Sequence, residues 1–277
     1  MGEPFATPED EWGAFLSGTH PHLHDPTPFR FIPSKPRCRL CRAPFGAPGS
    51  VIFRRYGYTP WPKNPQVCSR CFQGLETVAK GCPKGEDTQV GGAEVELSML
   101  FADVRGSSKI ARQMPTLEFT RLMNRFYRTS SEVLWSADAI VEKFIGDEVV
   151  GLFIPFMTGQ QHATKAIAAA EQLLQATGHG SSQGPWLPLG VGVNTGVAFV
   201  GIVASAGGNS DFTALGDPVN VAAHLAAQAA DGEILVTEAT ATSADLDRTI
   251  LERRHLSLKG HPVDCVVLGE RTVTSAS

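Results

Sequence analysis

The sequence predicts an α+β fold, in which helices cover a mostly antiparallel sheet, preceded by a small metal-binding module. Two observations carry this prediction. From about residue 94 the apolar patterning gives the order strand, helix, hairpin, helix, hairpin, helix, strand, helix, hairpin, which is typical of a sheet with covering helices. Before that region, two C-x-x-C pairs, Cys38-Cys41 and Cys68-Cys71, lie in a stretch too short for a large apolar core.

Composition sets the broad class of the protein. The 277 residues carry a formal net charge of -4 and are 42% hydrophobic, as in an ordinary globular protein without a global basic field for nucleic acid or acidic lipid. The sequence has no apolar run of about 18 residues and its first residues lack the order of a signal peptide, so we expect a cytoplasmic protein with no membrane partner. The predicted organisation is an irregular arm (1–36), a Cys-rich module (37–85), a linker (86–93), a large domain (94–270) and a tail (271–277).

The four paired cysteines have the pattern of a structural metal site. Cys38 and Cys41 are followed, after 26 residues, by Cys68 and Cys71, and two such knuckles can place four thiolates around one Zn²⁺. An iron–sulfur centre and a redox dithiol pair remain alternatives, and Cys82 is near enough to replace a ligand. Basic and aromatic residues between the knuckles could bind nucleic acid, but we expect them to form the module's core.

The large domain opens with a strand over 94–103, a turn over 104–108 and a helix from Lys109. A second helical stretch covers about 116–134, and two apolar arms around Gly146-Asp147 predict a hairpin over 139–153. The remaining expected elements are a helix over 161–177, a hairpin of 187–193 with 197–203 turning at Asn194-Thr195-Gly196, a run at 212–215, a helix capped by Asp217 with Pro218 in its first turn, a strand over 232–237, a helix over 238–246 and an edge hairpin over 253–269.

Two acidic residues suggest chemistry. Asp103 ends a strand just before Gly106, Ser107 and Ser108, where a carboxylate could hold a cation and the free N–H groups of a helix start could meet phosphate oxygens. Taken alone, Ser and Asp at such a position also serve as helix caps, and an Asp in a turn can be structural. The pairing of Asp103 with Asp147 favours a site.

Four blocks of sequence, in order, carry a resemblance to a known family: Leu100-Phe-Ala-Asp-Val-Arg-Gly106, Val141-Glu-Lys-Phe-Ile-Gly-Asp147, Leu189-Gly-Val-Gly-Val-Asn-Thr-Gly196 and Phe212-Thr-Ala-Leu-Gly-Asp-Pro-Val-Asn-Val-Ala-Ala-His-Leu225. Together they cover the region from about Glu94 to Glu270. This region resembles the catalytic domain of class III nucleotidyl cyclases. For the first 90 residues the sequence supports no family beyond a pattern similar to a zinc ribbon.

The resemblance implies a ferredoxin-like, palm-type domain that forms a homodimer with active sites between the subunits. It implies that Asp103, Val104 and Asp147 belong to a site for two Mg²⁺ or Mn²⁺ ions, and that Gly106, Ser107 and Ser108 bind substrate phosphates. Lys143 and Thr213 would accept adenine, which favours ATP over GTP. Asn220 would orient the ribose from the other subunit.

One position departs from the family. Four residues after Asn220 the family has an Arg that stabilises phosphate charge in the transition state, and here the residue is His224. Imidazole is shorter than guanidinium and is mostly neutral at pH 7. The expected function is therefore a signalling adenylate cyclase, which converts ATP to cyclic AMP and pyrophosphate, with His224 in the catalytic role and reduced activity. The alternatives are a cyclase-like protein that binds nucleotide without turnover, and a nucleic-acid-binding protein that uses its Cys module.

Overall fold

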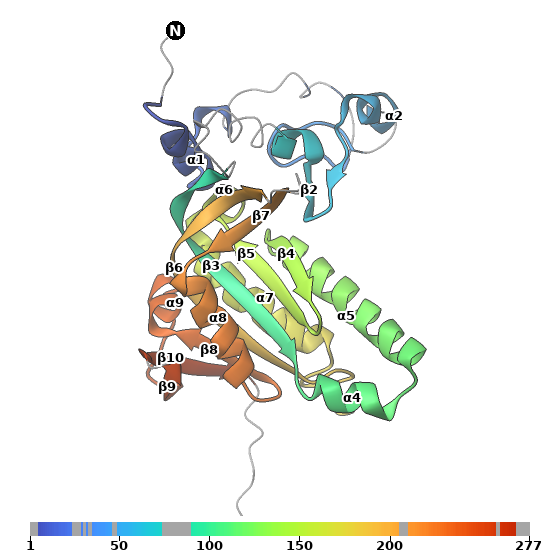
Figure 1. Ribbon diagram of the computed structural model, residues 1–277, viewed down its shortest axis with the longest axis vertical. Coiled ribbons are helices and arrows are strands. Elements are labelled where there is room, and N and C mark those ends of the chain that lie inside the picture. Colours follow the sequence, from blue (N-terminus) through green and yellow to red (C-terminus); the bar gives the residue numbers. More distant parts are fainter. Residues whose placement is uncertain are drawn as a thin grey trace, which may run out of the picture. The chain divides into compact units, whose positions relative to one another are not determined.

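The computed structural model describes residues 5–23, 29, 32, 35–45, 49–73, 90–204, 210–258 and 261–269. Its contacts divide the chain into two compact units. Unit 1 contains residues 1–96, 154–159 and 197–215, and unit 2 contains 97–153, 160–196 and 216–277. Figure 1 shows the helices and strands of both units.

In the N-terminal part of the chain, the structure has the elements α1 (Pro8–Leu16), η1 (Pro21–Leu23), α2 (Gly49–Phe53), η3 (Arg54–Tyr56), β1 (Pro60–Trp61) and β2 (Asn64–Cys68). The later elements are β3 (Val90–Val104), α4 (Ser107–Gln113), α5 (Thr116–Ser136), β4 (Ile140–Ile145), β5 (Glu148–Phe153), α6 (Pro155–Thr158), η4 (Gly159–Gln161), α7 (His162–Ala176), β6 (Leu189–Ala204), β7 (Ser210–Leu215), α8 (Asp217–Gln228), β8 (Glu233–Thr237), α9 (Glu238–Ser243), β9 (Glu252–Leu258) and β10 (His261–Gly269).

The large sheet has eight strands in the order β4-β5-β3-β6-β8-β10-β9, and β7 pairs with β6. Pairing is antiparallel between β3 and β5, β4 and β5, β6 and β7, β8 and β10, and β9 and β10, whereas β6 and β8 are parallel. The predicted α+β class with a mostly antiparallel sheet and covering helices is confirmed.

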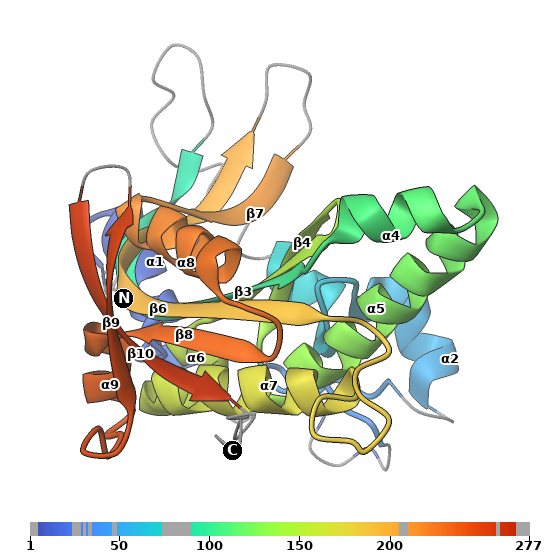
Figure 2. The ribbon, with the colours of Figure 1, turned by 90° about the horizontal axis from the view of Figure 1, so that it is seen from below.

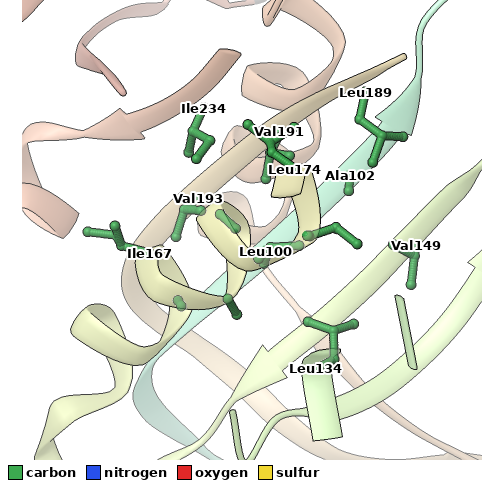
Figure 3. Close-up of a cluster of buried hydrophobic side chains, with 14 of the residues drawn as sticks. Leu100, Ala102, Leu134, Val149, Ile167, Leu174, Leu189, Val191, Val193 and Ile234 are labelled. Carbon is green, nitrogen blue, oxygen red and sulfur yellow. The ribbon is translucent and has the colours of Figure 1, made fainter. Parts of the chain in front are cut away.

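In unit 2, helices pack on both faces of the sheet, because neighbouring side chains of a strand point to opposite faces. On β8, Ile234 and Val236 belong to the main core with α5 and α7, whereas Leu235 packs with α8. Figure 2 shows α7 and α8 on opposite sides of β6 and β8. Figure 3 shows the main core, where Leu100 and Val193 of the sheet lie beside Ile167 and Leu174 of α7.

Two glycines of β6 allow α8 to lie directly on the sheet. A Cβ on Gly192 would be 2.3 Å from the Ala226 nitrogen and 2.4 Å from the Ala222 oxygen, and a Cβ on Gly190 would be 2.7 Å from the Ala229 oxygen. The alternation in Leu189-Gly-Val-Gly-Val193 therefore has a packing reason: glycines face the backbone of α8 and the larger side chains face the main core.

The hairpin predicted at Asn194-Thr195-Gly196 is wrong, because β6 runs without a break from Leu189 to Ala204. The Asn194 side chain is used inside unit 2: it donates to the Pro218 oxygen (2.8 Å) and accepts from the Thr237 hydroxyl (2.8 Å). A Cβ on Gly196 would lie 3.0 Å from the Pro218 ring. Asn194 and Gly196 therefore do not form a turn but pack the start of α8 against a continuous strand. The hairpin that does form in this region joins the second half of β6 to β7, with Phe199 opposite Leu215 and Ala204 opposite Ser210.

Other boundaries also differ from expectation. β3 begins at Val90, so the last four residues of the predicted linker 86–93 belong to a strand. Asp217 is the first helical residue of α8 rather than its cap, and Gly216 holds the cap position without a side-chain bond. Residues 69–73 are helical, while the rest of the helix expected over 72–79, and Cys82, lie outside the described residues. The domain boundaries remain a prediction.

Unit 1 contains the cysteine module, whose apolar contacts involve Phe29 and residues between the two knuckles. Phe29, Phe53 and Tyr58 form an edge-to-face cluster with ring centroids 5.1–6.0 Å apart. Cys38, Val67 and Cys68 are buried in a cluster against which Phe29 and Tyr58 pack. These contacts agree with the expectation that the aromatics form a core. In the described parts of the chain, no helix is both long and apolar enough to cross a membrane.

Candidate active site and metal sites

The hairpin of β4 and β5 presents Asp147 at its turn, as predicted. Ile145 and Glu148 are paired, and Gly146 adopts a φ of 62°, a left-handed conformation that favours glycine. The hydroxyl of Tyr127 on α5 donates to the Gly146 oxygen. This bond and the hairpin together hold the turn in one position against α5.

Asp103 and Glu148 are cross-strand neighbours at the end of β3. The Val104 nitrogen donates to the Asp147 oxygen over 3.2 Å, which joins the end of β3 to the hairpin turn. The predicted residues Asp103, Val104 and Asp147 are therefore brought together, and Glu148 adds a third carboxylate. Val104 itself is 3% exposed, so its side chain belongs to the core.

Arg105 is the counter-ion of this acidic cluster. Its guanidinium forms an ion pair with the Asp103 carboxylate and donates from Nη1 to the oxygens of Ala227 (2.9 Å) and Ala229 (3.2 Å). Arg105 therefore links the end of β3 to the C-terminal end of α8, where backbone carbonyls favour a cation.

The acidic cluster holds more negative charge than one arginine balances. Burial raises the pKa of Glu148 to about 7, helped by the charges of Asp103 and Asp147 and opposed by Arg105. Burial also raises the pKa of Asp103, with Asp147 adding to the effect and Arg105 opposing it. Carboxylate oxygens are the ligands that Mg²⁺ and Mn²⁺ prefer, so the donor chemistry of these residues suits divalent cations.

Replacing Glu148 by glutamine should stabilise the metal-free protein at high pH. The pKa of the Glu148 carboxyl rises from 4.5 to about 7 on folding, so this group lowers the free energy of unfolding progressively as the pH increases between those values. After allowance for its partial exposure, we expect Glu148→Gln to gain about 1–2 kcal/mol of unfolding free energy at pH 8, and nothing below about pH 4.5. Chemical denaturation in the presence of chelator measures the free energy of unfolding, with the exposed Glu132→Gln as the control. An equal gain at pH 8 and below pH 4.5 would contradict the prediction.

Gly106, Ser107 and Ser108 follow directly on the acidic cluster. Gly106 has a φ of 66° and caps α4, which begins at Ser107. The first N–H groups of a helix have no acceptor within the helix. The predicted phosphate-binding residues thus lie three to five positions after Asp103, at a helix start.

The two residues expected to accept the base lie in different surroundings. On β4, Lys143 forms an ion pair of 2.8 Å with Glu142, whose side chain is 2% exposed, next to an irregularity in the register. On β7 in unit 1, Thr213 is 7% exposed and lies opposite Gly201 of β6. Glu142 orients Lys143, a role that the sequence did not predict.

Asn220 and His224 lie one turn apart on α8, as predicted. Asn220 is exposed and His224 is partly exposed. The helix that carries them is fixed to the sheet by Gly192 and by the Asn194–Pro218 bond, and its C-terminal end is tied to Asp103 by Arg105. Asn220 and His224 therefore lie on a helix that is packed directly on the sheet.

The four cysteines of unit 1 come together in space. Their sulfurs all lie within 4.8 Å of one another, with Cys38 and Cys71 at 3.9 Å and Cys41 and Cys68 at 3.6 Å. Zn–S bonds of about 2.3 Å in a tetrahedron place sulfurs roughly 3.8 Å apart. The Cys68 nitrogen donates to the Cys38 sulfur (3.3 Å), and the other three thiols lower the pKa of Cys38. The cluster fits one tetrahedral metal ion.

Besides Glu142, sequence reasoning missed Arg105 and Glu148. Each is a charged residue close in sequence to a predicted metal ligand, Arg105 two positions after Asp103 and Glu148 directly after Asp147. The signal available in the sequence was a charged residue close to an acid at the end of a strand or in a turn. It could not indicate which of the neighbours points into the cluster.

Comparisons with known proteins agree with this geometry. Residues 93–270 match the family described as the adenylate and guanylate cyclase catalytic domain. An uncharacterised protein of Mycobacterium tuberculosis is 27% identical over 180 residues, 64% of this chain and 32% of that protein. An adenylate cyclase of Anabaena cylindrica is 28% identical over 152 residues, 52% of this chain and 30% of that protein. The chain thus spans about a third of the length of these relatives.

Solved structures show the same fold. The guanylyl cyclase Cya2 has a TM-score of 0.56 and 25% identity, and the match covers 68% of this chain and 98% of that one. The adenylyl cyclase CyaB from P. aeruginosa has a TM-score of 0.55 and 23% identity, with 65% and 97% covered. Proteins named for either nucleotide therefore resemble this chain.

Proposed function

The chain belongs to the adenylate and guanylate cyclase catalytic domain family, and from this premise we propose that it is an adenylate cyclase that converts ATP to cyclic AMP and pyrophosphate. The observation that carries the proposal is the carboxylate cluster of Asp103, Asp147 and Glu148 at the end of β3, directly before the start of α4. In this arrangement a substrate triphosphate would have cation ligands on one side and free helix N–H groups on the other.

The reaction needs attack of the ribose 3′ oxygen on the α-phosphorus, loss of the hydroxyl proton and departure of pyrophosphate. Two divalent cations held by the carboxylates of Asp103 and Asp147 and the backbone oxygen of Val104 would supply charge to activate the hydroxyl and to neutralise the leaving group. Gly106, Ser107 and Ser108 would bind phosphate oxygens. Arg105 would hold the Asp103 carboxylate in place from the side.

Selection of ATP would rest on Lys143 and Thr213. The ε-ammonium of Lys143 can donate to a ring nitrogen of adenine, and its ion pair with Glu142 fixes the direction of the side chain. This preference is part of the proposal, since relatives named for either nucleotide resemble the chain.

Asn220 and His224 would complete the site from a second copy of the chain. One chain carries both halves of such a site, so a symmetric homodimer would have two complete sites. Asn220 would orient the ribose, and His224 would donate to the phosphates in the transition state.

Mixing two inactive variants tests this arrangement. Asp103→Asn and Asn220→Ala damage different halves, so a mixed dimer keeps one intact site. With random exchange, half of the dimers are mixed and each has one of two sites, so about a quarter of the parent activity should return. Each variant alone at the same total concentration is the control. No recovery, when affinity-tagged chains prove that exchange occurred, would contradict a shared site.

A second candidate function is nucleotide binding with little or no turnover, and His224 is the observation that favours it. A histidine donor is shorter than arginine and lacks its two-pronged geometry. Under this alternative the metal and nucleotide would still bind, and the activity of the variant His224→Arg separates the two functions.

For the cysteine module we propose structural Zn²⁺ bound by Cys38, Cys41, Cys68 and Cys71. Purified protein should hold one zinc per chain and be colourless, and Cys68→Ala should lose the metal, because a structural zinc site needs all four ligands. Elemental analysis and an absorption spectrum measure this, with Cys265→Ala as the control outside the cluster. A coloured protein containing iron and sulfide would contradict zinc and support the iron–sulfur alternative.

A further inference from the structure

The cysteine module contacts β7 through Lys63, in the turn between β1 and β2. Within unit 1, the Lys63 ammonium donates to the Phe212 oxygen over 2.9 Å and forms an ion pair with Asp211. The Lys63 side chain is 21% exposed and that of Asp211 is 57% exposed. The bond to a backbone oxygen means that Lys63 fixes the strand itself, not only a neighbouring side chain.

An aromatic cluster reinforces this contact. The rings of Trp61 and Phe72 stack with centroids 4.3 Å apart, and both are in edge-to-face contact with Phe212, with centroids 5.9 Å and 5.6 Å from it. Phe212 is 2% exposed. Aromatic pairs of this geometry contribute beyond their buried area, so two rings of the module hold the side chain of Phe212.

Both parts of the contact are attached to the metal ligands. Cys68 ends β2 and is paired with Pro60, the residue before Trp61. Phe72 directly follows Cys71. A metal that joins Cys68 and Cys71 would therefore fix the two segments that contact β7.

The next residue on β7 is Thr213. Because side chains alternate along a strand, holding Phe212 on the module side fixes Thr213 on the opposite face. β6 beside it is tightly confined: a Cβ on Gly201, the partner of Thr213, would be 2.2 Å from the Gly91 oxygen. A shift of Phe212 would therefore move Thr213, because β6 beside it has little room to adjust.

We propose that Lys63 and Trp61 are positioning residues for Thr213, so that the metal-loaded cysteine module sets the choice of nucleotide base by the cyclase domain. The inference rests on the base-accepting role proposed for Thr213. The module would thus affect base recognition through its contact with β7.

Lys63→Ala tests the inference with little risk to the metal site. We expect the ratio of kcat/KM for ATP to that for GTP to fall about threefold to fivefold, the range for a partly exposed ion pair plus a hydrogen bond. Lys63→Arg should keep the ratio, since it can still donate to Phe212 and Asp211. The exposed Arg55→Ala, in the same module, controls for loss of a positive charge. A general loss of stability would lower both rates equally and leave the ratio unchanged.

Hydrogen exchange gives a readout that does not depend on activity. In zinc-loaded protein, Lys63→Ala should speed exchange of amides in 211–215 and leave those of α7 unchanged. If the parent converts neither nucleotide, the proposed function fails, and exchange alone decides the coupling between module and strand. Unchanged exchange in 211–215, or an unchanged nucleotide ratio in a protein that is active, would overturn the inference.

Discussion

Asp103→Asn is expected to lower cyclase activity at least about a thousandfold in saturating Mn²⁺, because the substitution removes a metal-binding charge while keeping the size of the side chain. Asp103 lies opposite Glu148 and is joined to the Asp147 turn by the Val104 bond, so its loss affects the whole cation site. The measurement is the rate of cyclic AMP formation at fixed protein concentration.

The matched control is Asp245→Asn. Asp245 is exposed and has a φ of 51°, a conformation that asparagine tolerates well. This variant should keep the parent rate. Thermal unfolding must show that Asp103→Asn remains folded, since the change also removes the partner of Arg105. A folded Asp103→Asn protein with more than about a tenth of the parent rate would contradict two-metal catalysis at this cluster.

His224→Arg is expected to raise the rate with ATP by up to about a hundredfold, the usual worth of one transition-state donor. Arginine restores a fixed positive charge and two parallel donors on the outer part of α8. The rate should rise mainly in kcat, because the developing phosphate charge exists only in the transition state.

His255→Arg controls for the added charge, since His255 is on an edge strand and its side chain is 83% exposed. It should leave the rate unchanged. If His224→Arg is no faster than the parent, His224 does not occupy the catalytic position. If the parent binds ATP without turnover and His224→Arg gains activity, the second candidate function describes the natural protein.

The hairpin around Asp147 could be predicted because its signal is local: two apolar arms and a glycine that adopts a positive φ. The same kind of signal failed at Asn194-Thr195-Gly196, where Asn194 is buried in one long strand and forms hydrogen bonds with Pro218 and Thr237. Residue types that favour turns also suit close packing between elements. The sequence does not distinguish the two uses without the tertiary partner.

The candidate site shows the same division. The acids Asp103 and Asp147 follow from strand ends and turns, and the four cysteines follow from spacing. The Arg105 bridge to Ala227 and Ala229, and the contact of Lys63 with Phe212, join residues more than 120 positions apart. Only the folded chain brings such pairs together, and the sequence offered no periodicity that would have indicated them.

The most direct test of the central claim is the rate at which the purified parent protein makes cyclic nucleotide from ATP and from GTP in Mn²⁺. We predict that cyclic AMP and pyrophosphate form in equal amounts and that cyclic AMP forms faster than cyclic GMP. Formation of both cyclic nucleotides should stop when chelator removes the cations. Bound ATP with no cyclic product, in the parent and in His224→Arg alike, would contradict it.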